Sequence, residues 1–80
     1  MSKTKKNGDI ANVIHRFAEK DIHIEVLCDA YKLNMSVCYR GYVTYKDGDS
    51  WIAEDMGCYG GDWMEAFNSC VEYATEISGV

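Results

Sequence analysis

The spacing of the apolar residues changes twice along the chain, and these changes limit the folds that it can adopt. From Gly8 to Lys20, apolar side chains recur every three or four residues, which is the stripe of an amphipathic helix. From Ile22 they recur at every second residue, which is typical of a strand with one buried face. From Asp62 the helical spacing returns and continues to Ser78. The sequence therefore predicts a helix, a block of strands and a second helix.

The block between the helices is predicted to contain three strands, the first beginning at Ile22, the second running from Lys32 to Lys46 and the third from Ser50 to Met56. The second is longer than an ordinary strand, so we expect a bend or bulge near Gly41. The pair Asp47-Gly48 then supplies the backbone angles that a tight hairpin turn requires. Residues 57–61 are rich in glycine and are predicted to form a loop.

A three-stranded sheet with one apolar face needs a cover, and two amphipathic helices supply it. We therefore expect an α+β fold, a two-layer sandwich in which a three-stranded antiparallel meander is covered by two helices in αβββα order. A chain of 80 residues makes a single domain, which we place at residues 8–80. The polar, basic residues 1–7 are predicted to be a flexible tail, and Trp51, Trp63 and Phe67 are assigned to the core.

The predicted order and size resemble the double-stranded RNA-binding domain, in which lysines at the start of the last helix hold phosphates. The corresponding segment of this chain is Gly60-Gly61-Asp62-Trp63-Met64-Glu65-Ala66, which contains two acids and no base. The resemblance therefore implies the fold alone, and we expect no direct binding to nucleic acid. The segment 57–66 also resembles the N-terminal domain of HicB-type antitoxins, where a strand, a Gly-Cys turn and a Glu-Ala helix start follow one another.

Charge is divided unevenly along the chain. Residues 1–46 hold all eight bases and five acids, whereas residues 47–80 hold eight acids and no base, and the net charge is −5. This balance disfavours a nucleic-acid backbone or an anionic membrane as the partner. The acids form either a solvated helix face with an ordinary N-cap or a patch that meets a basic surface. The candidate partner-binding residues are Asp62, Glu65, Glu72, Glu76, Glu54, Asp55, Tyr59 and Tyr73.

In size and charge the chain resembles the small acidic accessory proteins of bacteriophages, of which the anti-CRISPR proteins are examples. This resemblance implies an inhibitor that occupies a basic surface on a nucleic-acid-binding or defence protein of the host. Two alternatives are kept. One is a homodimeric structural or assembly module that uses the open sheet face, which is predicted to carry Leu27, Cys38 and Tyr42. The other is a HicB-like antitoxin.

No motif in the chain predicts catalysis, and we expect neither enzymatic activity nor a cofactor or metal. Glu54 and Asp55 are neighbours on a predicted strand, so they should point to opposite faces and cannot work as a pair. The four cysteines are widely spaced, without the Cys-x-x-Cys pairs of zinc sites. Because no secretory signal or membrane span is recognised, we expect the cytoplasm of a bacterial host and free thiols; two disulfides are the alternative.

Overall fold

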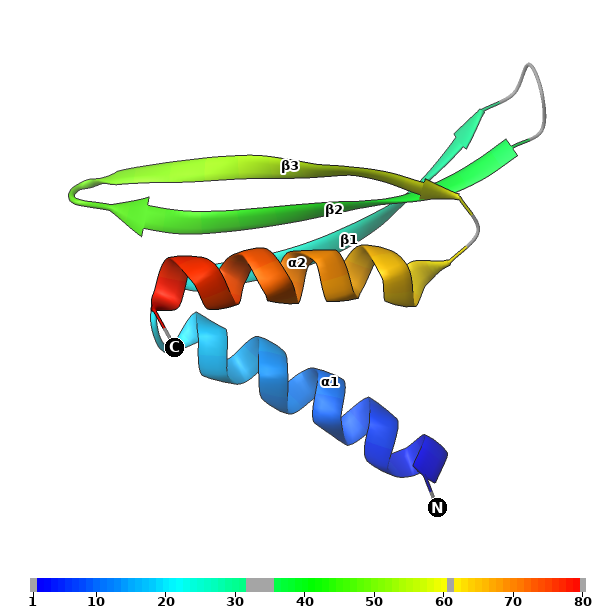
Figure 1. The fold of residues 1–80 in the computed structure, drawn as a ribbon, viewed down its shortest axis with the longest axis horizontal. Helices are drawn as coiled ribbons and strands as arrows, with labels where there is room; N and C mark the ends of the chain where they lie inside the picture. The colour runs from blue at the N-terminus through cyan, green and yellow to red at the C-terminus, as the bar shows by residue number, and fades with distance from the viewer. Residues whose placement is uncertain (1, 32–35, 61, 80) are drawn as a thin grey trace.

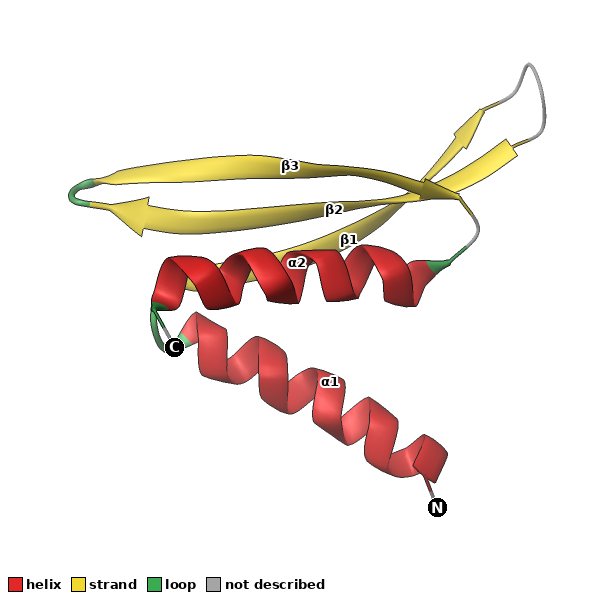
Figure 2. Cartoon of the chain, viewed as in Figure 1, coloured by secondary structure: helices red, strands yellow, loops and turns green. Residues whose placement is uncertain are grey.

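A three-stranded antiparallel sheet packs against the C-terminal helix, and the N-terminal helix contacts its first strand and runs away from the sheet (Figure 1). The computed structural model describes residues 2–31, 36–60 and 62–79. The elements, which Figure 2 shows by type, are α1 (Ser2–Ala18), β1 (Ile22–Tyr31), β2 (Ser36–Asp47), β3 (Ser50–Gly60) and α2 (Trp63–Ser78). The strands lie in the order β1-β2-β3. The predicted α+β sandwich with αβββα order is therefore confirmed.

Two element boundaries differ from the sequence prediction. Helix α1 begins at Ser2 rather than at Gly8, so residues 2–7 are helical instead of preceding the helix. Strand β3 continues through residues 57–60, which were predicted to be a loop, and this prediction is wrong. The start of the predicted second strand, residues 32–35, lies outside the described residues.

A bulge in β3 explains how the glycine-rich segment continues the strand. Gly41 of β2 pairs with Gly57, but the next residue, Tyr42, pairs with Asp55. Met56 is therefore an extra residue on β3, and the alternation of side-chain direction shifts after it. Tyr59 consequently faces α2 and Cys58 faces away from it. A register shift therefore occurs at Gly41, where a bend or bulge was predicted, but the extra residue belongs to β3 and not to the second strand.

Short turns connect β2 to β3 and α1 to β1. Asp47 and Ser50 pair across the β2–β3 hairpin, and Gly48 between them has φ 65°, as the predicted tight turn requires. After α1, Asp21 adopts φ 60°, a left-handed conformation that Asp tolerates better than most residues. Residues 19–21 form the turn from α1 into β1, and Asp21 is its last residue.

The core lies between α2 and the centre of the sheet. Four α2 residues are buried (Ala66, Phe67, Cys70 and Ala74), and they pack toward the fully buried Val43 of β2 and Ile22 of β1. The Trp63 ring stacks on the Phe67 ring with centroids 5.0 Å apart, as expected of a helix start that packs on the sheet. Trp51 is 51% exposed, and its assignment to the core is wrong.

Helix α2 lies close to the sheet at Gly41. A Cβ atom at this position would lie 2.5 Å from the Cys70 sulfur and 3.1 Å from the Ala66 carbonyl oxygen. The Cys70 thiol also lies 3.9 Å from the Tyr42 carbonyl oxygen, to which it donates. Only glycine fits at position 41 while α2 keeps this distance from the sheet.

Helix α1 is packed less completely than α2. Its apolar stripe is half-buried along its whole length and consists of Ile10, Val13, Ile14, Phe17 and Ala18. The axes of the two helices come together near their C-terminal ends and diverge toward the start of α1 (Figure 1). The two helices are therefore near each other only toward their C-terminal ends.

The Gly41→Ala variant should lower the free energy of unfolding by about 1–3 kcal/mol, because the added methyl overlaps the Cys70 sulfur. Urea unfolding measures this change. Gly60→Ala is the matched control: a Cβ at position 60 meets nothing within 4 Å, so a change within about 0.5 kcal/mol is expected. Equal stability of the two variants would show that α2 does not approach Gly41 closely.

Candidate protein-binding surface

One side of α2 carries three exposed carboxylates. Glu65, Glu72 and Glu76 are exposed, and their spacing of seven and four residues places them on one side of the helix. The buried stripe around Cys70 separates them from the side of α2 that faces α1. We call Glu65, Glu72 and Glu76 the acidic flank.

Asp62 stands at the N-terminal end of α2 and caps the helix. Its Oδ1 atom accepts hydrogen bonds from the backbone N–H groups of Met64 at 2.9 Å and Glu65 at 3.4 Å. The predicted N-cap is therefore confirmed, and a cap of this kind stabilises a protein by about 1 kcal/mol. The positive end of the helix dipole offsets the charge of Asp62, so this carboxylate adds less to the negative surface than the acidic flank does.

Glu54 lies on the helix-facing side of β3, next to Tyr73 of α2. The pKa of Tyr73 is raised to about 12, first by its hydrogen bond with Tyr45, then by burial, and then by the negative charge of Glu54. The Tyr45 and Tyr73 rings meet edge to face with centroids 6.3 Å apart. Tyr73 is therefore neutral and half-buried. It follows Glu72 of the acidic flank in α2 and contacts Tyr45 of β2.

Tyr59 belongs to β3 and not to the predicted glycine loop. Its hydroxyl oxygen lies 2.6 Å from the Ser69 hydroxyl oxygen, which is a hydrogen bond between the strand and α2. Ser69 lies between Glu65 and Glu72 on the same side of the helix. Tyr59 thus holds the acidic flank against β3, and this contact leaves it half-buried.

Asp55 is separated from the other candidate acids by the sheet. It points to the face without helices, opposite to Glu54, as their adjacent positions on a strand predict. Its Oδ2 atom lies 2.8 Å from the Arg40 guanidinium, and its Oδ1 atom accepts from the Gly57 backbone N–H at 2.7 Å. Asp55 therefore supports the bulge in β3 and is already paired with a cation.

The bases whose side chains the structure describes lie away from the acidic flank. Arg16 lies near the C-terminal end of α1 and Lys20 in the turn that follows it, and both line the space between α1 and α2. Arg40 and Lys46 are on the sheet face without helices. Among the described side chains, none of these bases forms an ion pair with the acidic flank. The structure thus gathers three of the predicted acids on one helix side, with Glu54 nearby, and leaves Asp55 out.

The sheet face without helices is a second candidate surface. The strand register places Leu27, Tyr42 and Cys38 on this face, as predicted. It also carries Trp51, which the sequence assigned to the core; its ring lies 5.5 Å from the His23 ring and 5.8 Å from the Lys46 ammonium. We call this surface the open face. Trp51 alternates with Ile52 and Glu54, which lie on the helix-facing side of β3.

The cysteines differ from the predicted set of free thiols. Cys38 of β2 and Cys58 of β3 form a disulfide on the open face, with Cα atoms 5.8 Å apart, so the prediction is wrong for this pair. The bulge causes the difference, because it turns Cys58 to the face on which Cys38 lies. Cys28 is an exposed thiol and Cys70 a buried one. Burial raises the pKa of Cys70 to about 11, which makes it a poor nucleophile at neutral pH.

The comparisons with known protein families, with curated proteins and with solved structures find no match to this chain. Neither helix in the described part of the chain has the length and apolarity that crossing a bilayer requires. Within the same residues, no three histidine, cysteine or acidic side chains form a group that could hold a metal ion. The geometry of the two surfaces is therefore the basis for any functional conclusion.

The Cys58→Ser variant should lose about 3 kcal/mol of unfolding free energy, because the disulfide closes a loop with a sequence separation of 20. Urea unfolding with and without a reductant measures the loss. Cys28→Ser removes an exposed thiol outside the disulfide and should change stability by less than about 0.5 kcal/mol. An oxidised chain no more stable than the reduced one would contradict this prediction.

Proposed function

We propose that this chain is a small protein-binding module whose acidic flank occupies a basic surface on a partner protein. The observation that supports this proposal is the separation of charge around α2. Glu65, Glu72 and Glu76 are exposed together, while the described bases lie on other surfaces. Such a one-sided arrangement favours an oppositely charged partner and opposes a nucleic-acid backbone.

The partner that we propose is a nucleic-acid-binding or defence protein of a bacterial host. A site that binds a phosphate backbone is a concentrated basic surface, and carboxylates on a rigid helix can compete for it. The chain would then act as an inhibitor, in line with the phage accessory proteins that it resembles in size and charge. Complementary charge would mainly raise the association rate and the specificity for the partner.

Rigid positioning of the acidic flank supports this proposal. The Asp62 cap fixes the start of α2, and the Tyr59–Ser69 hydrogen bond joins its side to β3. Little conformational entropy is therefore lost when the three carboxylates meet a partner. In this proposal Tyr59 and Tyr73, which are both half-buried, hold α2 against the sheet beside the acidic flank.

Reversing the charge of the acidic flank (Glu65→Lys, Glu72→Lys and Glu76→Lys together) should weaken partner binding at least about tenfold without unfolding the chain. The measurement is capture of proteins from a bacterial lysate on the immobilised chain, followed by affinity determination for the protein recovered. Binding by the unaltered chain should also weaken between 0.1 M and 1 M salt, where the Debye length falls from about 10 Å to about 3 Å.

The matched control reverses three exposed acids elsewhere, Glu19, Asp47 and Asp49, and makes the same change in net charge. This variant should keep its binding. If both triple variants lose binding equally, net charge and not the acidic flank determines it. If the first variant binds normally, the proposed function is wrong.

Self-association through the open face is the second candidate function, and the exposure of two large apolar side chains on it favours this alternative. Leu27 is 44% and Trp51 is 51% exposed. Half-buried Tyr42 lies between them on the central strand. An uncovered sheet face with such side chains commonly packs against a second copy or another protein.

Light scattering at micromolar concentrations tests the second candidate. A homodimer through the open face should become monomeric when Leu27→Glu and Trp51→Glu are combined, because two charges would then be buried without partners. Val37→Glu is the control, since Val37 is 45% exposed but belongs to the opposite side of the sheet. A chain that is monomeric before any substitution contradicts self-association and leaves the acidic flank as the binding surface.

A further inference from the structure

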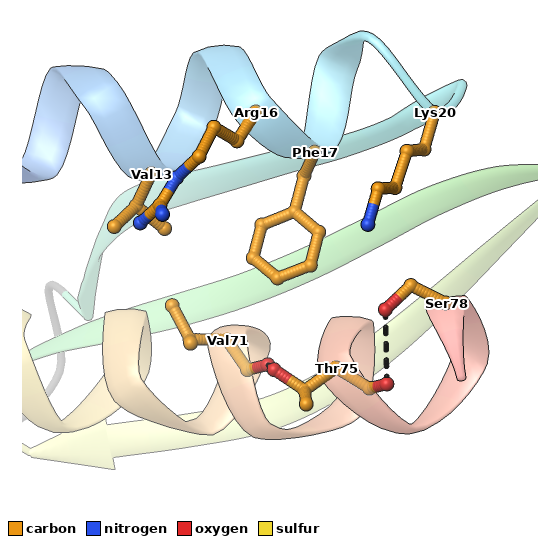
Figure 3. A pocket seen from close by; sticks show the side chains of 7 residues that line it. All are labelled: Val13, Arg16, Phe17, Lys20, Val71, Thr75 and Ser78. Carbon is orange, nitrogen blue, oxygen red and sulfur yellow. Dashed lines mark hydrogen bonds between the residues drawn. The ribbon is translucent and has the colours of Figure 1, made fainter. Parts of the chain in front are cut away.

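A groove lies between the C-terminal halves of the two helices, on the side of α2 that faces α1. Its volume is about 250 Å³. It is lined by Val13, Arg16, Phe17 and Lys20 from α1 and its following turn, and by Val71, Thr75 and Ser78 from α2 (Figure 3). The groove lies where the two helices come together near their C-terminal ends.

The inner surface of the groove is apolar. Figure 3 shows the Phe17 ring pointing from α1 toward α2, with Val13 beside it and Val71 facing it from α2. The Thr75 hydroxyl donates to the Val71 carbonyl at 2.7 Å, and the Ser78 hydroxyl donates to the Thr75 carbonyl at 3.0 Å. Both hydroxyl protons are therefore used within α2. A ligand on this surface would therefore make apolar contacts.

Two cations stand at the edge of this apolar surface. Arg16 and Lys20 are four residues apart and lie on either side of Phe17, and the Lys20 side chain points toward Ser78 (Figure 3). The residues that line the groove include no acid. Asp9 and Glu19 line a neighbouring hollow with Arg16, but among the described residues neither cation forms an ion pair. The groove thus combines two cations at its edge with an apolar inner surface.

We infer that the groove binds a single aliphatic chain with an anionic head, of the class of a fatty-acid carboxylate. The head would pair with Arg16 and Lys20, and the chain would lie against Phe17 and Val71. An inorganic anion would leave the apolar surface unused, and a neutral hydrocarbon would leave the cations unused. The volume suits one chain, since it is just below the 300–1,000 Å³ typical of sites for drug-sized ligands.

The test is a titration of the intact chain with decanoate, below its micelle concentration, followed by NMR. Saturable shifts are expected at the Val13 and Val71 methyl groups and at the Phe17 ring. The double variant Arg16→Gln with Lys20→Gln should weaken binding about tenfold, since it removes two partly exposed ion pairs with the head. Lys46→Gln removes one positive charge on the open face, away from the groove, and should leave binding unchanged.

Val71→Glu provides a second readout, because it places a carboxylate on the apolar surface at a half-buried position outside the buried core of α2. This variant should abolish the titration. Equal affinity for decyltrimethylammonium and decanoate would overturn the inference, as would shifts centred on Leu27 of the open face. Tighter binding of an acidic amphipathic helical peptide than of decanoate would also overturn it, since the occupant would then be a partner helix.

Discussion

The close contact between α2 and the middle of β2 determines where every surface of this protein lies. Gly41 has no side chain, and the residues that face it, Ala66 and Cys70, are small, so the helix and the strand approach one another closely. At this separation the side chains interlock and fix the rotation of α2 about its axis. One side of the helix then presents the acidic flank, and the other side forms the groove with α1.

The order of the elements could be predicted from the sequence because each change of hydrophobic period marks a surface that must be buried. The limits of β3 could not. Residues 57–60 include two glycines, which have a low strand propensity, and non-local contacts hold the segment as a strand: pairing with β2, the Cys38–Cys58 disulfide and the Tyr59–Ser69 hydrogen bond. The helical start of α1 was missed for a related reason, since residues 2–7 carry no apolar stripe to indicate a helix.

The candidate site was predictable only where helix geometry alone decides it. Glu65, Glu72 and Glu76 share one side of any helix that spans them, whatever the strands do. The position of Tyr59 and the disulfide partner of Cys38 depend on the strand register and the bulge, which no local pattern specifies. Trp51 was misplaced because β3 carries apolar side chains on both faces, so its alternation does not identify the buried one.

The extra residue Met56 divides β3 into two segments with opposite phase. Before it, even-numbered residues such as Glu54 face the helix; after it, odd-numbered residues such as Tyr59 do. A relative of this chain that lacked one residue here could keep the hairpin and both helices. It would nevertheless exchange the directions of Cys58 and Tyr59, losing the covalent link on one face and the hydroxyl contact on the other. Indel variation at this point would therefore alter both surfaces of the molecule at once.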